Sequence, residues 1–294
     1  MEIIMPDYVI VTDSASDMPK ELVEELEIGI TPLQFSIAGH SYFDNPLQRD
    51  LDPLDFYRMM REGNVAKTSQ VNIDQFTEFF EPILQSGKDI LYIGFSSGLS
   101  GTVSSGFTAA QELTAKYPQQ KIIVIDTLAA SLGMTLLVYH AVQKKREGLS
   151  IDVVAEWVRR QMPHTCHWVT VEDLVYLKRG GRISATASIV GSVLNVKPII
   201  HVDNEGRLVV KSKVRGRKQS LETLANKMQE FCIDPTEQTV FICHADALED
   251  AQIIGSLIQS TLRVKEVKYG LMGPVIGAHT GPGALALFFF GRHR

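Results

Sequence analysis

Apolar residues along the chain occur in short continuous runs separated by more polar, periodic segments. Three runs rich in β-branched residues, 8–12, 90–93 and 121–125, each end in small polar residues. Runs without polar alternation are typical of parallel strands that are covered on both faces. The sequence therefore predicts a parallel sheet that contains these three segments.

Helical spacing of apolar residues follows each of these runs. After the first run, Asp17 can cap a helix that has Pro19 near its start and Leu22 on its apolar face. Residues 102–117 follow the second run and residues 129–145 follow the third. This alternation of strand, loop and helix predicts a parallel sheet with helices on both sides.

The pattern changes near Pro163, which ends a helical segment. The elements expected after it are a strand at 167–171, a hairpin of 199–202 with 207–211, helices at 219–231 and 247–262, and strands at 240–243 and 264–269. We therefore predict an α/β protein of two domains. Residues 1–164 would form the parallel-sheet domain, and residues 165–294 would form a mixed-sheet α/β domain.

Composition agrees with two globular domains and excludes some functions. The 294 residues are 45% hydrophobic and 21% charged, which allows a large buried core. The net charge of −5 lacks the basic excess of a nucleic-acid-binding protein. Three cysteines at wide spacing, Cys166, Cys232 and Cys243, are typical of free thiols in a reducing compartment.

The N-terminal sequence indicates where the protein works. Residues 1–14 lack a basic region and an apolar stretch of signal-peptide type, and read as a first strand. The apolar run that comes closest to a transmembrane segment, residues 284–290, is far too short to span a bilayer. We therefore expect a cytoplasmic location, and we expect the charged end after this run to be solvated.

The segment 94–102, Gly-Phe-Ser-Ser-Gly-Leu-Ser-Gly-Thr, is the most informative candidate site. It lies between an apolar strand and a helix start, where glycines allow close approach of a ligand and free N–H groups favour an anion. Ser96, Ser97, Ser100 and Thr102 add hydroxyl donors. The segment lacks the lysine of a phosphate-binding P-loop, and a tight turn with helix capping is the alternative interpretation.

Three further segments could supply polar groups to the same site. Thr68 and Ser69 form a second hydroxyl cluster, for which a helix cap is the alternative. Arg182 follows a Gly-Gly bend and could turn towards an anion, or belong to a solvated basic loop. His279 lies in the segment 274–283, which reads as a strand ending in a Gly/Pro turn, and a structural role is its alternative.

Other chemistry is less well supported by the residues. His164, Cys166 and His167 lack a second ligand pair, so we expect no metal. Asp13 and Asp126 follow strands, where capping and loop closure are better explanations than acid–base catalysis. Residues 94–98 fit Gly-x-Ser-x-Gly loosely, so an esterase that uses Ser96 with His279 stays open as an alternative.

Taken in order, the motifs resemble the DegV family. The matching pieces, which cover nearly the whole chain, are residues 11–14, 68–70, 96–102, 124–126 with 130–133, 177–183, 197–199 and 277–283. The resemblance implies a fatty acid buried between two lobes. It also implies that such a protein works as the acyl-binding subunit of a bacterial fatty acid kinase, whose kinase partner phosphorylates the bound carboxylate for phospholipid synthesis.

The resemblance also implies roles for individual residues. Thr68 with Ser69, and Ser96 or Ser97, would hold the carboxylate, and which of the last two does so stays open. Arg182, His279 and Thr280 would complete the polar network, while Arg215 would contact the kinase subunit. The protein would then be a binding subunit with no catalytic residue or cofactor of its own, and transient contact with a membrane would be compatible with this role. A lipid sensor without phosphoryl transfer is a further alternative.

Overall fold

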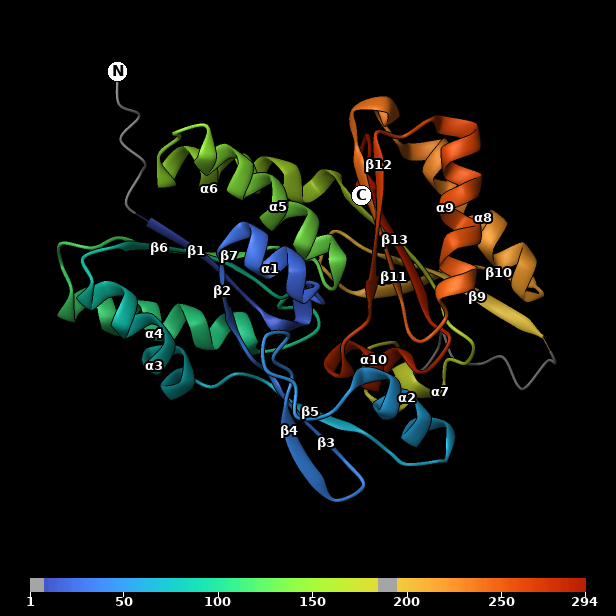
Figure 1. Ribbon diagram of the computed structural model, residues 1–294, viewed down its shortest axis with the longest axis horizontal. Helices are drawn as coiled ribbons and strands as arrows, with labels where there is room; N and C mark the ends of the chain where they lie inside the picture. Colours follow the sequence, from blue (N-terminus) through green and yellow to red (C-terminus); the bar gives the residue numbers. More distant parts are fainter. Residues whose placement is uncertain (1–7, 185–194) are drawn as a thin grey trace.

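The computed structural model describes residues 8–184 and 195–294, which form two α/β regions side by side (Figure 1). The first region is built on a parallel sheet of four strands in the order β2-β1-β6-β7. These strands are β1 (Tyr8–Asp13), β2 (Gly29–Thr31), β6 (Asp89–Gly94) and β7 (Ile122–Asp126). The parallel sheet predicted from the three apolar runs is confirmed.

Helices cover both faces of this sheet (Figure 1). Helices α5 (Leu132–Arg146) and α6 (Ile151–Gln161) lie on one face, and α3 (Ile73–Gln85) and α4 (Thr102–Lys116) lie on the other. Asp17 follows the 3-10 helix η1 (Ser14–Ser16), and Pro19 rather than Asp17 precedes α1 (Lys20–Leu26). Asp17 is buried and its side chain makes tertiary hydrogen bonds, so it is not the cap that its position predicts.

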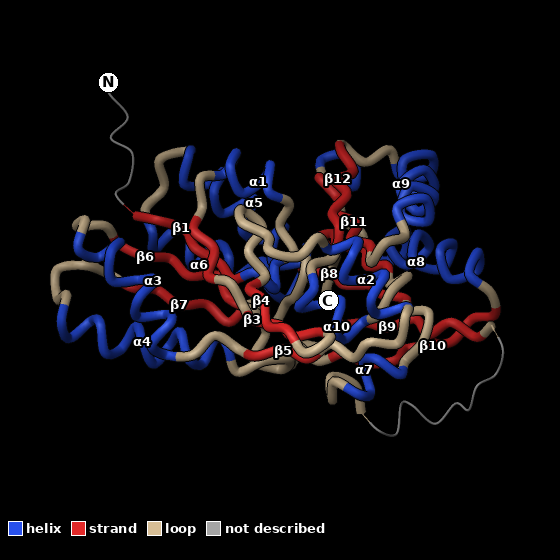
Figure 2. The backbone as a smooth tube through the Cα atoms, turned by 60° about the horizontal axis from the view of Figure 1, so that its bottom comes forward, coloured by secondary structure: helices blue, strands red, loops and turns tan. Residues whose placement is uncertain are grey.

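The second region is built on a mixed sheet of six strands in the order β10-β9-β8-β13-β11-β12. The β11–β12 pair is parallel and the other pairs are antiparallel. The strands are β8 (Thr165–Thr170), β9 (Val196–Val202), β10 (Leu208–Arg215), β11 (Thr239–His244), β12 (Glu266–Leu271) and β13 (Leu285–Phe290). The mixed α/β character predicted for this half is confirmed, and the strands of both sheets run through the middle of the molecule in Figure 2.

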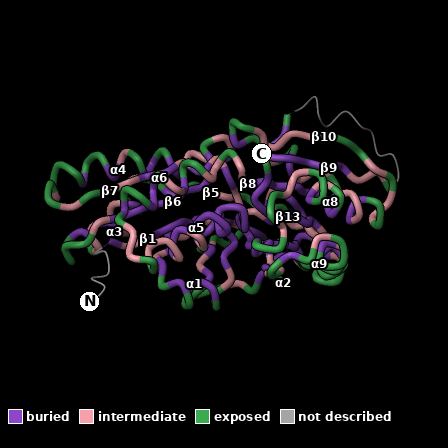
Figure 3. Tube along the Cα trace, turned by 90° about the horizontal axis from the view of Figure 1, so that it is seen from above, coloured by how far each residue is buried: buried purple, intermediate pink, exposed green. Residues whose placement is uncertain are grey.

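Alternation along the strands of the mixed sheet gives it two different faces. Trp168, Ile199 and Phe289 pack in a core with α8 (Arg217–Phe231) and α9 (Leu248–Leu262). The neighbouring residues Val169, Ile200 and Phe288 belong to the large core that also contains the parallel sheet. Successive side chains of a strand point to opposite faces, so the second set is directed towards the first region. Figure 3 shows the buried strands between helices that combine buried, intermediate and exposed residues.

A small antiparallel sheet, which the sequence did not indicate, joins the two regions. It has the order β4-β3-β5 and consists of β3 (Gln34–Ile37), β4 (His40–Phe43) and β5 (Lys67–Ser69). Three helices lie near this sheet: α2 (Pro53–Arg61), α7 (Val175–Arg179) and α10 (Pro274–Thr280). The structure also contains two short 3-10 helices, η2 (Met162–His164) and η4 (Pro235–Glu237). The predicted hydroxyl cluster at Thr68 therefore lies on a strand.

The strand predicted at 274–283 is wrong, because this segment begins as helix α10. Pro274 occupies the first turn, where a missing N–H costs nothing. Two buried carboxylates from the first half of the chain accept the N–H groups that remain free there. Asp17 Oδ1 accepts from Gly273 N at 2.9 Å, and Asp44 Oδ2 accepts from Val275 N at 3.3 Å.

The expectation of a solvated charged end is confirmed for Arg292 and His293, which are exposed, and is wrong for Arg294. Residues 285–290 form β13, and Arg294 beyond it is only 9% exposed. Its guanidinium donates to the carbonyl oxygens of Leu128 at 2.5 Å and Met162 at 2.8 Å, and burial lowers its pKa to about 10.

None of the described helices has both the length and the apolar character needed to cross a bilayer.

Candidate functional site

A cavity of about 840 Å³, measured out to its opening, lies between the two regions. Its walls combine residues from the mixed sheet, from the loops after β6 and β7, from β5, from α10 and from the segment that follows α7. The apolar lining consists of Leu33, Phe95, Leu99, Ala130, Val169, Leu177, Ile200, Val202, Leu208, Met272, Val275, Ile276, Ala286 and Phe288. This apolar lining suits a small molecule with a large hydrocarbon part.

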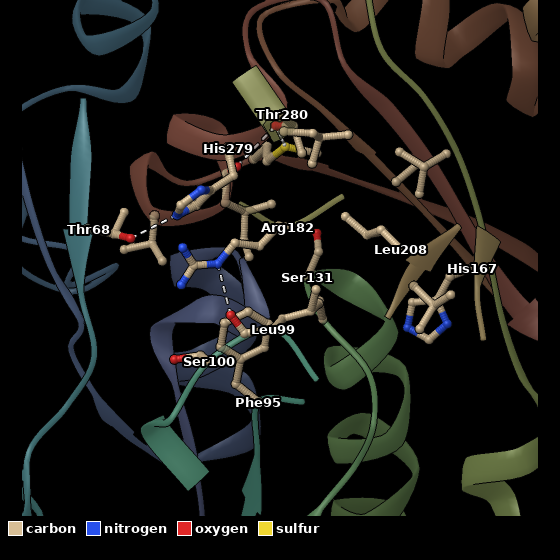
Figure 4. A pocket seen from close by; sticks show the side chains of 18 of the residues that line it. Thr68, Phe95, Leu99, Ser100, Ser131, His167, Arg182, Leu208, His279 and Thr280 are labelled. Atoms are coloured by element: carbon tan, nitrogen blue, oxygen red, sulfur yellow. Dashed lines mark hydrogen bonds between the residues drawn. The ribbon is translucent and has the colours of Figure 1, made fainter. Parts of the chain in front are cut away.

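Polar side chains gather at one end of the cavity. Figure 4 shows Thr68, His279 and Arg182 together, with Leu208 and His167 on the opposite side of the view. Within the described part of the chain, no aspartate or glutamate lines the cavity. A cation beside an apolar space without a carboxylate favours a ligand that has one anionic group and an apolar body.

Thr68 and His279 form a hydrogen-bonded pair at the polar end. Thr68 reaches the site from β5, which pairs with β3, and His279 comes from the last turn of α10. The Thr68 Oγ1 to His279 Nε2 distance is 2.8 Å. When Nε2 carries the ring proton and donates to Oγ1, the Thr68 hydroxyl proton is free to donate to a ligand.

The surroundings keep the His279 ring neutral. Burial, and then the nearby positive charge of Arg182, lower its pKa to about 4. Its Nδ1 atom is buried without a hydrogen-bond partner among the described residues. A Cβ atom at Gly180 would lie 2.1 Å from Nδ1, so only glycine allows the chain to pass this close to the ring.

Arg182 turns inward, which is one of the two alternatives that its position after the Gly-Gly bend allows. Its Nε donates to Leu99 O at 3.0 Å and its Nη1 donates to Gly180 O at 2.5 Å. These carbonyl contacts fix the guanidinium, while no carboxylate in the described ranges pairs with it. The remaining N–H groups are therefore available for an anion at the polar end.

Further hydroxyl groups line the cavity, but each already has a protein partner. Ser100 Oγ accepts from Thr102 N at 3.2 Å, and Ser131 Oγ lies 2.5 Å from Asp17 Oδ2. Thr280 Oγ1 donates back to Ile276 O at 3.1 Å within α10. Ser131 and Gln70 also line the cavity, and no sequence motif predicted this role for them, although Gln70 directly follows the Thr68–Ser69 cluster.

The serines predicted as carboxylate ligands lie elsewhere. Ser96 is fully buried, donates to Gly206 O at 2.9 Å and accepts from Gly98 N at 3.1 Å. Ser69 and Ser97 are exposed, and none of the three serines lines the cavity in the described structure. Their role as ligand contacts stays a prediction, and this geometry favours a loop-closing role for Ser96.

Arg215 does not line the cavity. It is exposed at the last position of β10, and β10 is the outer strand of the mixed sheet. Leu208, at the first position of this strand, lines the cavity. Seven steps of strand lead from Leu208 to Arg215, which is roughly 23 Å. A partner contact at Arg215 would therefore lie well away from Leu208 and outside the cavity lining.

Asp13 and Asp126 close loops, as the sequence analysis favoured. Asp13 accepts hydrogen bonds from Tyr92 Oη at 2.7 Å, Phe95 N at 2.9 Å and Ala15 N at 3.1 Å. Burial raises its pKa to about 6 in spite of these donors. Asp126 Oδ1 accepts from the backbone N–H groups that follow β6 and β7. Among the described residues no cluster of three or more potential metal ligands occurs.

The fold and the cavity define a class: two-lobed α/β proteins that enclose an apolar cavity with a cationic, hydroxyl-bearing end. The chain belongs to the DegV family, whose description is "Uncharacterised protein, DegV family" and which matches residues 7–292. A DegV domain-containing protein of Clostridium perfringens is 45% identical over 287 residues, which cover 98% of each chain. The family resemblance read from the ordered motifs is confirmed.

Solved structures of other members have the same fold. A DegV family protein from Thermus thermophilus, described by its fatty acid binding, superimposes with a TM-score of 0.87 at 29% identity over 97% of this chain and 99% of that one. DegV of Bacillus subtilis, described as a fatty acid binding protein, gives a TM-score of 0.84 at 28% identity over 98% and 100% of the two chains. These matches confirm the two-lobed α/β architecture.

Proposed function

We propose that this protein binds a long-chain fatty acid, with the acyl chain in the cavity and the carboxylate at Thr68, His279 and Arg182. The observation that carries the proposal is the asymmetry of the cavity. Most of its wall is apolar, and Arg182, the one cation among the described lining residues, lies at one end. The fatty acid binding described for the relatives from Thermus thermophilus and Bacillus subtilis supports the same ligand class.

The apolar wall supplies the affinity for the acyl chain. Burial of some fifteen methylene groups contributes roughly 12 kcal/mol before the costs of association, at about 0.8 kcal/mol for each group. Ordering of the ligand and lost translational freedom offset much of this gain. The cavity therefore binds the hydrocarbon strongly without any directional contact, and the polar end fixes which end of the ligand lies where.

The polar end meets the needs of a buried carboxylate. An anion that leaves water requires donors and a compensating charge, and Arg182 offers both. Thr68 offers a hydroxyl proton if His279 holds Oγ1 through Nε2–H. Arg182 Nε and Nη1 already donate to carbonyl groups, so the carboxylate would contact the N–H groups of the guanidinium that remain free. In this binding mode one carboxylate oxygen stays accessible.

We further propose that the bound carboxylate is presented to a separate kinase subunit that forms an acyl phosphate. The sequence contains no P-loop motif and no kinase motif set, so the phosphoryl donor would be held by another protein. Arg215 is the candidate contact, because it is exposed at the end of an outer strand that also carries Lys211 and Lys213. Such positively charged side chains also protect a sheet edge from pairing.

The esterase alternative receives no support from the geometry. The Ser96 hydroxyl donates to the Gly206 carbonyl, and His279 pairs with Thr68. A serine nucleophile needs a base within hydrogen-bond reach of its own hydroxyl. An active-site serine probe should therefore leave Ser96 unlabelled.

Mass spectrometry of the purified protein tests the fatty acid proposal directly. Under native conditions the mass should exceed that of the chain by one long-chain fatty acid, and this ligand should be released on denaturation. Protein that neither carries nor takes up any long-chain fatty acid would refute the proposal. The proposed presentation to a kinase is tested by mixing the loaded protein with a bacterial fatty acid kinase subunit and ATP. If no acyl phosphate forms, the protein is a fatty acid carrier or a lipid sensor and not a kinase subunit.

A further inference from the structure

A second hollow opens on the polar end of the cavity. It measures about 690 Å³ out to solvent and shares Thr68, Arg182 and His279 with the cavity. Its own polar lining is Lys67, which precedes Thr68 on β5, and Arg179, which ends α7. We call this hollow, defined by Lys67, Thr68, Arg179, Arg182 and His279, the vestibule. It is continuous with the proposed position of the carboxylate.

All charged residues that line the vestibule in the described structure are cations. They are Lys67, Arg179 and Arg182, and no carboxylate is within the lining. Neither Lys67 nor Arg182 has an ion-pair partner in residues 8–184 and 195–294, and Arg179 only lies over the Tyr176 ring at 5.8 Å. Elsewhere on the surface the cations are frequently paired, as Lys121 is with Asp152. Three cations around one hollow, none of them paired with a carboxylate of the described residues, indicate a site for an anion.

The charge of the vestibule exceeds what a fatty acid carboxylate requires. A carboxylate has a charge of −1, which Arg182 alone balances, and in the proposed binding mode Arg182 and Thr68 hold it while one of its two oxygens stays accessible. A phosphate group carries a charge of about −1.5 to −2 at neutral pH and three acceptor oxygens. Arginine binds phosphate through two parallel hydrogen bonds and lysine binds it as a point charge. Lys67 and Arg179 therefore match the extra charge of a phosphorylated head group.

We propose that the vestibule is a phosphate subsite, in which Lys67 and Arg179 hold the phosphate of an acyl phosphate whose acyl chain occupies the cavity. This inference rests on the proposed fatty acid binding and adds a head-group preference to it. In the reaction, a carboxylate oxygen forms a bond to the terminal phosphorus of a nucleoside triphosphate, and the bond from that phosphorus to the bridging oxygen breaks. The nucleoside diphosphate leaves with the electron pair, and the new phosphate lies on the vestibule side of the carboxylate.

A pair of single-chain lipids that differ only in the head group tests the subsite. Hexadecanoic acid and hexadecyl phosphate are each titrated against the delipidated protein, and their dissociation constants are measured. In the double variant Lys67→Ala/Arg179→Ala, the affinity for hexadecyl phosphate should fall at least about tenfold, because two charge-assisted contacts are lost. The affinity for hexadecanoic acid should change by less than about threefold, because Arg182 and Thr68 hold its carboxylate in the proposed binding mode and solvent-exposed charges without direct contact contribute little.

A matched control removes the same charges elsewhere. Lys88 and Arg159 are exposed and line neither the cavity nor the vestibule. The variant Lys88→Ala/Arg159→Ala should bind both lipids as the unchanged protein does. Equal losses for the two lipids in the vestibule variant, or no loss for either, would overturn the subsite. Unchanged protein that binds hexadecanoic acid but not hexadecyl phosphate also overturns it, whereas protein that binds neither lipid overturns the fatty acid proposal itself.

Discussion

Two hydroxyl-bearing segments of this protein look alike in sequence and differ in what their hydroxyl groups do. Thr68 on β5 pairs with the neutral ring of His279 and lines the cavity. Ser96, in the loop after β6, is fixed between Gly206 O and Gly98 N and is fully buried. The partner of a hydroxyl therefore decides its role: a backbone carbonyl consumes the proton, whereas a ring N–H that donates leaves it free.

The difference has a structural cause in the contact between the regions. Gly206 lies in the turn between β9 and β10, so the Ser96 hydrogen bond joins the loop of the parallel sheet to the mixed sheet. A Cβ atom at Gly98 would lie 2.5 Å from Glu205 O, which shows how closely the two segments approach. Ser96 thus stabilises the arrangement around the cavity, while Thr68 faces the cavity itself.

The largest effect is expected for Arg182→Ala. Removal of the only lining cation in the described part of the chain leaves a buried carboxylate without its charge partner, so fatty acid affinity should fall by about 100-fold, or roughly 2–3 kcal/mol. Isothermal titration with hexadecanoic acid measures this change. The control Arg159→Ala removes an exposed arginine outside the cavity and should bind normally. Equal affinities for the two variants would contradict the assignment of the carboxylate end.

Thr68→Val sharpens the comparison from the cavity side. Valine keeps the shape of threonine but has no hydroxyl group, so the affinity for fatty acid should fall by about tenfold, as for one lost hydrogen bond to a charged group. The free energy of unfolding should change by less than about 1 kcal/mol, because Thr68 is only partly buried at the middle of a short strand. A large loss of stability with unchanged affinity would mean that the Thr68 hydroxyl, like that of Ser96, serves the fold and not the ligand.

Ser96→Ala tests the other side of the comparison. The lost bond to Gly206 should lower the free energy of unfolding by about 1–2 kcal/mol, measured by urea denaturation. Affinity for fatty acid should stay within about threefold of the original. The neighbouring variant Ser97→Ala, at an exposed position, should change neither quantity. Loss of binding with unchanged stability would instead support the sequence-based prediction that this loop holds the carboxylate.

The last test concerns pH, where the effect is absent near neutrality and grows in acid. Burial keeps the pKa of His279 near 4, below its ordinary value of 6.5, so the unfolded chain takes up a proton between these values before the folded protein does. His279 should therefore make the ligand-free protein less stable as the pH falls from 6.5 to 4. The difference in unfolding free energy between the original protein and His279→Gln should follow this slope and level off above pH 6.5. A difference that is constant with pH would contradict the neutral, buried ring.

Sequence periodicity was sufficient for the parts of the fold that depend on local pattern. The apolar runs predicted β1, β6 and β7, whereas the Gly-Gly bend before Arg182 allowed both an inward turn and a solvated basic loop. The helix at 274–280 was missed because Asp17 and Asp44, more than 200 positions away, accept its first N–H groups. Local propensity contains no information about such partners.

The cavity wall was not predictable for a related reason. Val169 faces the cavity and its neighbour Trp168 faces α8, and the two are equally apolar in sequence. Which of them points inward depends on the register of β8 with β13, where Val169 lies opposite Ala286. The roles of Ser96 and Thr68 were likewise set by Gly206 and His279, which are distant in sequence. Motif resemblance identified the participating segments, and the structure distinguished their residues.

The anchoring of α10 has a consequence for the order in which the protein matures. Asp17 and Gly273 are separated by 256 positions, yet their contact fixes the start of the helix that carries His279. During synthesis the parallel sheet can be complete long before residue 273 is translated, and contacts between such distant residues form late because closing long loops is costly in entropy. Lipid uptake should therefore begin only when the last part of the chain has emerged from the ribosome. A product that stops before residue 273 would keep the parallel sheet but would lack His279 and also β13, the strand between β8 and β11.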